Sequence, residues 1–266
     1  RRHACIYKCG LFLYDLLSGK SNLGEHTSVN KVQMERVCPE LKSDDLIKGF
    51  SYYDGLMDDY KLGLWAVKQA KQYGNLTVLE NTTINKIDIN GNVFYKNYKV
   101  KYDKVINITG PWAHELLRDS NIKSKVELDL VKGSHILVNR NLDKGYLLEV
   151  PNERRIFFVI PYDNQTLIGT TEVRQSIKSD IKPTQREIIY LIEAYNFYFK
   201  NQITQKNIIK TFSGLRPLIK SSNYANKITR EYRLTNIGQL ISVFGGKWTT
   251  SRQLAKKVYK EVCKKG

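Results

Sequence analysis

The sequence predicts a mixed α/β fold, with α/β segments toward both ends of the chain and antiparallel strands in the middle. Three observations support this prediction. Apolar residues recur at helical spacing after Asp58-Asp59. Residues 126–171 alternate apolar and polar side chains, which is typical of an antiparallel sheet. Residues 240–244 form a strand-like run that enters a helix through a glycine pair, an arrangement typical of α/β folds.

The first part of the chain predicts two helices. Residues 10–17 predict a short apolar helix, which a polar, glycine-containing loop follows through residue 27. A longer helix is predicted from Asp58-Asp59, whose carboxylates suit a helix start, to Gly74, which suits a helix end. Its side chains at helical spacing are Leu62, Trp65, Ala66, Gln69, Ala70 and Tyr73.

Strands dominate the next region. Residues 77–79 and 83–89 predict strands, and the Asn90-Gly91 pair predicts a hairpin turn into residues 92–95. Residues 105–108 predict a buried strand. This strand runs into a helix through Gly110, followed by a proline that suits the first helical turn.

The middle of the chain predicts long antiparallel strands and one helix. Apolar residues at 126, 128 and 130 share one face of a strand. Residues 156–160 and 166–169 flank a turn at Asp163-Asn164. Residues 184–200 return to helical spacing, so a helix is predicted there.

The overall composition predicts a folded protein without a membrane span. The chain has 266 residues, 41% hydrophobic residues and 11% aromatic residues, which argues against disorder. No apolar run approaches the roughly 18 to 20 residues that a membrane span needs. The cysteines (Cys5, Cys9, Cys38 and Cys263) lack the spacing of a zinc site, so reduced thiols and a cytoplasmic setting are expected. Because the first residue is Arg1, a fragment or a processed piece is expected.

The net charge of +17 raises the question of an anionic partner. Lysines are spread through every segment rather than clustered, so an ordinary solvated surface explains the charge best. Attraction to an anionic membrane surface is the second interpretation. Specific nucleic-acid binding is disfavoured, because it requires a basic patch.

The strongest chemical signal lies at residues 240–250. A strand ends in Gly245-Gly246, which allows close backbone approach to a ligand, and Lys247 follows directly. Thr249 and Thr250 are expected to cap the next helix. Backbone amides, a helix dipole and an ammonium group would then meet at one point, so an anionic ligand is expected.

Two arginines and a histidine are weaker candidates. Arg216 stands between a glycine and a proline, where a fixed guanidinium suits bidentate recognition of phosphate or carboxylate. From this segment alone, a structural pairing with a surface acid is the better explanation, and it applies with more force to Arg230, for which the neighbouring Glu231 is an obvious partner. His135 suits a base or a hydrogen-bond donor, although a structural histidine in a strand is the commoner case.

Five motif blocks follow one another along the chain, namely Asn107-Ile108-Thr109-Gly110-Pro111-Trp112, Val131-Lys132-Gly133-Ser134-His135-Ile136, Phe158-Val159-Ile160-Pro161 with Ile168-Gly169-Thr170-Thr171-Glu172, Ser213-Gly214-Leu215-Arg216-Pro217-Leu218, and Ser242-Val243-Phe244-Gly245-Gly246-Lys247-Trp248-Thr249-Thr250. Together and in this order they resemble the FAD-dependent glycerol-3-phosphate dehydrogenase family of the D-amino-acid-oxidase-like superfamily. Weaker similarity at residues 10–15 and 49–54 extends the resemblance over nearly the whole chain.

The resemblance implies a D-amino-acid-oxidase-like fold with a partial FAD-binding domain and a substrate domain on a largely antiparallel sheet. It assigns residues 1–48 and 126–231 to the substrate domain, and residues 49–125 and 232–266 to the FAD-binding domain. It implies oxidation of sn-glycerol 3-phosphate to dihydroxyacetone phosphate, with electrons passed to membrane quinone. A peripheral location on the cytoplasmic side of the inner membrane follows, and homodimer formation is left open.

The resemblance also implies residue roles. Arg216, Arg230 and Lys247 match positions that bind substrate, with Arg216 and Lys247 also catalytic. The positions that match the FAD site are Gly110, Gly245, Gly246, Lys247 and Thr249. The base that removes the C2 hydroxyl proton is not identified, and no metal is expected.

Two family features do not occur in this sequence. The family opens with a Gly-x-Gly-x-x-Gly turn that holds the FAD pyrophosphate, and it carries a C-terminal helical extension. Within the blocks, Thr109 replaces the usual alanine and Trp248 the usual leucine. We therefore expect the 266-residue chain by itself to hold FAD weakly and to lack independent activity.

Two rival functions follow from the same residues. A related FAD amino-acid oxidase would use an arginine for the substrate carboxylate, and turnover of glycine or sarcosine would distinguish it. A non-catalytic basic module, binding a lipid surface or nucleic acid, would ignore FAD and bind more weakly as salt rises.

Overall fold

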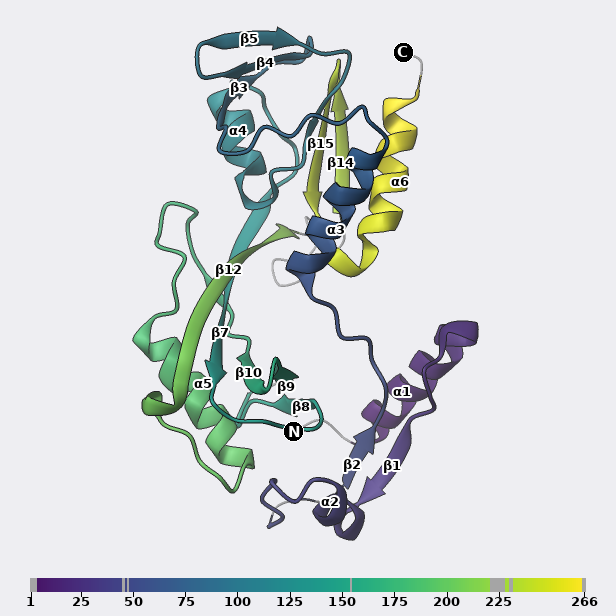
Figure 1. Ribbon diagram of the computed structural model, residues 1–266, viewed down its shortest axis with the longest axis vertical. Helices are drawn as coiled ribbons and strands as arrows, with labels where there is room; N and C mark the ends of the chain where they lie inside the picture. The colour runs from purple at the N-terminus through teal and green to yellow at the C-terminus, as the bar shows by residue number, and fades with distance from the viewer. Residues whose placement is uncertain are drawn as a thin grey trace. The chain divides into compact units, whose positions relative to one another are not determined.

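The structure is a computed structural model that describes residues 4–44, 46, 48–153, 155–220, 228–229 and 232–264 (Figure 1). The chain forms two compact units. Unit 1 comprises Arg1–Met57, Ser134–Thr171 and Lys182–Ser213. Unit 2 comprises Asp58–Gly133, Glu172–Ile181 and Gly214–Gly266. The assignment of substrate and FAD-binding roles to separate parts of the chain stays a prediction.

Helices and strands both occur in each unit. The helices are α1 (Ala4–Ser18), α2 (Lys31–Val37), α3 (Asp59–Gln72), α4 (Ala113–Asp119), α5 (Gln185–Tyr198) and α6 (Ser251–Val262), with short 3-10 turns η1 (Gly19–Ser21), η2 (Gly110–Trp112), η3 (Gln205–Asn207) and η4 (Trp248–Thr250). The strands are β1 (Thr27–Asn30), β2 (Lys48–Ser51), β3 (Ile84–Ile87), β4 (Asn92–Tyr95), β5 (Tyr98–Lys101), β6 (Val105–Asn107), β7 (Leu128–Val138), β8 (Tyr146–Glu149), β9 (Ile156–Tyr162), β10 (Gln165–Gly169), β11 (Val173–Arg174), β12 (Ile208–Lys220), β13 (Ile228–Thr229), β14 (Tyr232–Ile237) and β15 (Leu240–Gly245).

The predicted helices are confirmed, with local adjustments. Helix α1 starts six residues before the predicted position 10. Helix α3 begins as predicted, because the Asp58 side chain accepts a hydrogen bond from the Lys61 amide, and Gly74 follows it with a φ of 77°. Helix α5 opens with a reciprocal capping box between Thr184 and Glu187.

Most predicted strands are confirmed as well. The β3–β4 hairpin forms around Asn90-Gly91, and the β9–β10 hairpin forms around Asp163-Asn164. The strand predicted at residues 77–79 is wrong, because none of the described strands pairs with these residues. Val78 and Leu79 are 40% and 56% exposed, so β-forming side chains there find neither a neighbouring strand nor a core.

The strands in the described part of the chain form four sheets. The largest sheet has the order β13-β12-β7-β10-β9-β8, with β11 also pairing to β7. The strand pairs β7–β10, β9–β10, β8–β9, β7–β11 and β12–β13 within it are antiparallel, which confirms the antiparallel middle region. In unit 2, the β14-β15-β6 sheet contains the parallel pair β6–β15, and β3-β4-β5 is a meander. Figure 1 shows α3 and α6 beside β14 and β15.

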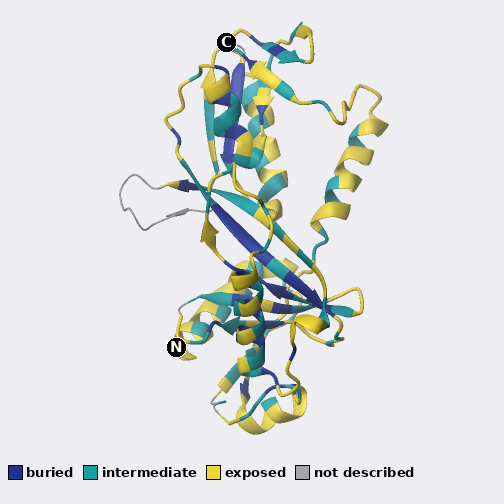
Figure 2. Cartoon of the chain, turned by 90° about the vertical axis from the view of Figure 1, so that its left-hand side faces the viewer, coloured by how far each residue is buried: buried dark blue, intermediate teal, exposed yellow. Residues whose placement is uncertain are grey.

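Each unit has its own hydrophobic core. In unit 1, alternate residues of β9 point inward, so Phe157 and Val159 are fully buried while Phe158 is exposed. They pack with residues of α5, including Leu191. The core of unit 2 is smaller and centres on Phe244 and other buried residues, namely Ile87, Val93, Ala113, Leu117, Val126, Ile219 and Leu240. Figure 2 shows that buried positions follow the strands, whereas the helices carry many exposed residues.

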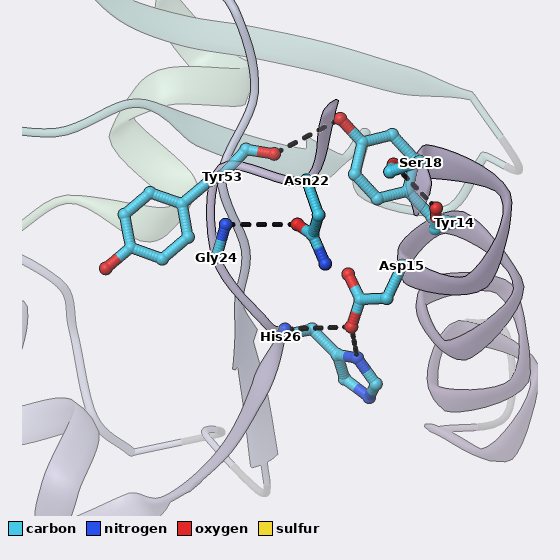
Figure 3. A network of polar contacts seen from close by, with 7 residues as sticks. All are labelled: Tyr14, Asp15, Ser18, Asn22, Gly24, His26 and Tyr53. Carbon is cyan, nitrogen blue, oxygen red and sulfur yellow. Dashed lines mark hydrogen bonds and ion pairs between the residues drawn. The ribbon is translucent and has the colours of Figure 1, made fainter. Parts of the chain in front are cut away.

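A polar network joins α1 to the chain around β1 and β2 in unit 1 (Figure 3). Asp15 Oδ2 accepts a 3.0 Å hydrogen bond from the His26 amide and lies 2.5 Å from His26 Nδ1. The Tyr14 hydroxyl donates a 3.2 Å hydrogen bond to the Tyr53 carbonyl. The two weakly similar segments, residues 10–15 and 49–54, therefore meet in space.

No helix in the described part of the chain is both long enough and apolar enough to cross a membrane.

Candidate functional site

Two parallel strands of unit 2 end side by side and turn into helices. The paired residues Asn107 of β6 and Ser242 of β15 are each followed, three residues later, by a glycine. Both Gly110 and Gly245 adopt left-handed backbone conformations, with φ values of 58° and 69°. Because ligands bind beyond the carboxyl ends of parallel strands, this edge is the candidate site of the unit.

The turn after β6 is held by Asn107, which is only 2% exposed. Its amide nitrogen donates a 3.1 Å hydrogen bond to the Ala113 carbonyl. Its carbonyl oxygen accepts a 2.7 Å hydrogen bond from the Thr109 hydroxyl. These two hydrogen bonds hold the turn. At Gly110, an added Cβ would meet no atom within 4 Å. The space beside Gly110 stays open for a ligand.

The turn after β15 brings the glycine pair Gly245-Gly246 close to α6. Gly246 has a φ of 101°, and an added Cβ would lie 3.2 Å from Leu254 Cδ2. Lys247 is exposed, and its carbonyl accepts hydrogen bonds from the Thr250 amide at 3.1 Å and the Thr250 hydroxyl at 3.2 Å. Figure 1 shows this segment leading from β15 into α6.

The expected threonine cap is absent from the described start of α6. Thr249 belongs to η4 and is exposed, and Thr250 occupies the N-cap position of α6 without a side-chain capping bond. The prediction of a cap was wrong because the Thr250 hydroxyl bonds back to Lys247 instead. The helix therefore starts at Ser251, and its first amides have no side-chain oxygen placed over them by Thr250.

These residues fit the flavin side of FAD. Backbone amides at a helix start, a neighbouring ammonium and two glycines with left-handed φ values suit a planar, partly anionic group approached by backbone. An open hollow at the start of α6 is lined by Thr249, Thr250, Arg252, Gln253 and Lys256. The same residues do not provide a pyrophosphate site, because the 266 residues contain no Gly-x-Gly-x-x-Gly motif.

Arg216 lies on β12 and is 30% exposed. Its Nη1 atom lies 3.6 Å from Glu172 Oε1, in another of the motif blocks. A partly exposed pair of this kind adds about 0–1 kcal/mol of stability, so orientation of the guanidinium is its larger effect. The predicted substrate residue Arg230 lies outside the described residues.

Three motif blocks meet at a buried acid that sequence reasoning missed. Glu187, in the first turn of α5, is 5% exposed and accepts hydrogen bonds from the hydroxyls of Ser134 and Thr171. Ser134 also shares a 2.8 Å hydrogen bond with Ser213. The Thr184-x-x-Glu187 capping box was the available signal for this residue, but it predicts only a helix start.

The His135 ring packs between the Phe212 ring and the backbone of Gly169 in unit 1. Its ring stacks on Phe212 with centroids 5.0 Å apart and planes tilted by 12°. It also pairs with Gly169 across β7 and β10. An added Cβ at Gly169 would lie 2.1 Å from His135 Cδ2, so only glycine leaves room for this ring position.

The structure thus gathers part of the predicted site. Among the described residues, one sheet edge of unit 2 carries Gly110, Gly245, Gly246, Lys247 and Thr249. Arg216 lies on a different strand and faces Glu172. Whether Arg216 and Lys247 bind the same ligand stays a prediction.

Known proteins show consistent similarity across the chain. It is 34% identical over 275 residues to the aerobic glycerol-3-phosphate dehydrogenase of Escherichia coli (strain K12), covering 96% of this chain and 53% of that protein. It is 31% identical to the D-erythritol 1-phosphate dehydrogenase of Brucella abortus (strain 2308), covering 96% and 54%. The chain spans about half the length of these relatives.

A solved structure gives the same result for the fold. The glycerol-3-phosphate dehydrogenase from Bacillus halodurans, solved in complex with FAD, matches with a TM-score of 0.76 and 25% identity. The match covers 98% of this chain and 55% of that one. The family of FAD dependent oxidoreductases, DAO, matches residues 12–251. The chain therefore belongs to the DAO family of FAD dependent oxidoreductases and has its D-amino-acid-oxidase-like fold.

Proposed function

We propose that this chain supplies substrate-binding and flavin-binding residues of an FAD-dependent dehydrogenase that oxidises sn-glycerol 3-phosphate to dihydroxyacetone phosphate. The observation that carries this proposal is the similarity to a glycerol-3-phosphate dehydrogenase over 96% of the chain. The aligned region includes the sheet edge where Gly110 and Gly245 turn away from parallel strands.

The cationic residues are proposed to bind the phosphate group of the substrate. A phosphate dianion needs two or three positive partners, and Arg216, Arg230 and Lys247 are proposed to supply them. The guanidinium of Arg216 is already oriented by Glu172, which lowers the entropy lost when a planar, two-pronged contact forms. Lys247 is exposed at the N-cap position of η4, and its side chain makes no capping hydrogen bond there.

The cofactor is proposed to be bound largely by backbone groups. Gly110, Gly245, Gly246 and Thr249 are proposed to contact the flavin, with Lys247 and the start of α6 facing its negative charge. When bound, FAD accepts the hydride from C2 of the substrate. The hydroxyl at C2 must lose a proton, and we assign this proton to the imidazole of His135.

The electron acceptor and the location are part of the same proposal. Membrane quinone is proposed as the acceptor, with the protein bound peripherally at the cytoplasmic face of the inner membrane. The net charge of +17 supports this location, because anionic lipid headgroups attract basic proteins.

A substrate panel tests the proposal. The encoded protein, expressed with any coding sequence that flanks these residues and loaded with FAD, should reduce a quinone analogue with glycerol 3-phosphate. D-Erythritol 1-phosphate, glycerol, glycine and sarcosine serve as comparisons. Faster turnover of erythritol 1-phosphate would move the substrate to a longer polyol phosphate. Turnover of the amino acids alone would contradict the proposal.

Two substitutions test the assigned residues in the same assay. Arg216→Lys should lower kcat/KM for glycerol 3-phosphate by about 10-fold or more, since an ammonium cannot form two parallel hydrogen bonds. Lys247→Met should raise KM and lower the flavin reduction potential, measured by redox titration. Arg174→Lys is the matched control, because Arg174 lies on the exposed strand β11 and pairs with Asp129 of β7. Equal kinetics in all three variants would remove Arg216 and Lys247 from the site.

A further inference from the structure

Glu187 of α5 carries a buried carboxylate whose two oxygens both accept hydrogen bonds. Oε1 accepts from the Ser134 hydroxyl at 2.7 Å and the Thr171 hydroxyl at 2.8 Å. Oε2 accepts from the Thr184 amide at 2.9 Å and the Thr184 hydroxyl at 2.8 Å. Only the Oε2 side is needed to cap the helix. The Oε1 side must therefore be explained separately.

The Oε1 side has a fixed direction of hydrogen bonding. A serine hydroxyl has one proton, and that of Ser134 is donated to Glu187, so Ser213 must donate to Ser134 across their 2.8 Å contact. The Thr171 hydroxyl donates to Glu187 and accepts from the Ser134 amide at 3.0 Å. Ser134 and Thr171 are 0% and 2% exposed, so water does not compete for these groups. One carboxylate oxygen thus orders three chain segments.

Each ordered segment carries a neighbour of the His135 ring. Ser134 directly precedes His135, and Ser213 directly follows Phe212, on which the His135 ring stacks. Thr171 follows two residues after Gly169, the position that leaves space for the ring. The hydrogen bonds to Glu187 therefore fix the backbone on all three sides of the imidazole.

We propose that Glu187 is a positioning residue for His135, keeping its imidazole stacked on Phe212 in a single orientation. The orienting role stands on the contacts within unit 1 alone. Its consequence for catalysis rests on the proposed function, in which His135 takes the C2 hydroxyl proton. Glu187 touches neither substrate nor cofactor in this proposal, and it acts through the backbone at Ser134, Thr171 and Ser213.

Nuclear magnetic resonance of the 266-residue chain with labelled histidine tests the orienting role without substrate or FAD. The chain has four histidines, and loss of one signal set in His135→Asn identifies the ring of interest. A stacked Phe212 ring shifts the His135 ring protons upfield and gives nuclear Overhauser contacts to them. Both signatures should weaken in Glu187→Gln and in Thr171→Val, which removes one hydroxyl at nearly constant volume.

Thr184→Ala is the matched control, because it removes the hydroxyl that donates to Oε2 and accepts from the Glu187 amide, and it leaves the Oε1 bonds in place. It should lower the melting temperature while the His135 signals stay as in the wild type. If Glu187 is only a helix cap, Glu187→Gln and Thr184→Ala will behave alike, with unchanged His135 signals, and the proposal is wrong. Thr171→Val decides the question by the same signals should Glu187→Gln fail to fold.

The kinetic consequence is measured separately in the encoded, flavin-loaded protein. Thr171→Val should lower kcat on the order of 10²-fold with a smaller change in KM, because displacement of a catalytic group by about 1 Å has that effect. Wild-type protein that shows the His135 signature but no glycerol 3-phosphate oxidation would contradict the proposed function and leave the orienting role standing. Full activity in Thr171→Val would contradict the catalytic consequence.

Discussion

At the scale of single residues, Asn107 and Asp15 illustrate how one side chain can order a turn. Asn107 uses its nitrogen to tie the end of β6 to the start of α4, and its oxygen to hold the Thr109 hydroxyl within the turn. Asp15 uses one oxygen to hold both the amide and the ring of His26. In each case a polar side chain replaces backbone partners that the turn removes.

The Asp15 contacts predict a local loss of structure in acid. The hydrogen bond from the His26 amide, with that from its ring, holds the pKa of the Asp15 carboxyl below its ordinary value. A carboxyl with a lowered folded pKa contributes stability above its unfolded pKa, about 3.9, and loses this contribution as the pH falls through the folded pKa. Amide hydrogen exchange at His26 should therefore accelerate as the pH falls below about 4, beyond the intrinsic trend.

Asp15→Asn is the informative variant for this prediction. Asparagine keeps an acceptor for the His26 amide but does not titrate, so the additional acceleration should disappear. If the same acid dependence remains in the variant, another group is responsible.

At the scale of elements, the β15–η4–α6 segment depends on backbone conformation more than on side chains. Gly245 and Gly246 both have left-handed φ values, and Leu254 of α6 packs against the second. A side chain at either position would strain the backbone, and at Gly246 it would also crowd the helix.

Gly246→Ala should therefore lower the free energy of unfolding by about 1–3 kcal/mol, the range for a residue held in an unfavourable backbone region. Gly10→Ala is the control, because Gly10 lies in α1 without a positive φ and with no atom within 4 Å of an added Cβ. It should stabilise the protein by about 0.5–1 kcal/mol. Urea unfolding of both variants measures the two changes, and equal stabilities would refute the assignment of strain to Gly246.

At the scale of the whole molecule, each compact unit has a separate core. The core of unit 1 includes Phe157 and Leu191, whereas that of unit 2 includes Phe244 and Leu117. None of the buried core residues described is shared between the two clusters. Separate cores predict that a cavity in one unit first loosens that unit.

Phe157→Ala should therefore lower the free energy of unfolding of unit 1 by about 3–5 kcal/mol. Hydrogen exchange should accelerate first at amides of β9, β10 and α5. Phe244→Ala should do the reverse, accelerating exchange at β15 and α4 first. Uniform acceleration across both units in either variant would mean that the chain unfolds as one cooperative body.

The sequence by itself determined the elements that local chemistry specifies. Alternation along β9, the Asp163-Asn164 turn and the Asp58 cap all depend on near neighbours, and the structure confirms them. Five ordered motif blocks also identified the family, because so many matches in one order are unlikely to arise by chance. The positions of Gly110 and Gly245 followed from strand-to-helix turns visible in the sequence.

The tertiary structure alone decided what distant residues do together. Residues 77–79 have strand-forming side chains but no partner among the described strands, and Thr250 bonds to Lys247 instead of capping α6. In the sequence, Glu187 has the spacing of a helix cap. In the structure, its Oε1 atom also accepts hydrogen bonds from Ser134 and Thr171, which lie 53 and 16 positions away. Hydrogen bonds between remote segments depend on the packing of β7, β10 and α5, which no local pattern encodes.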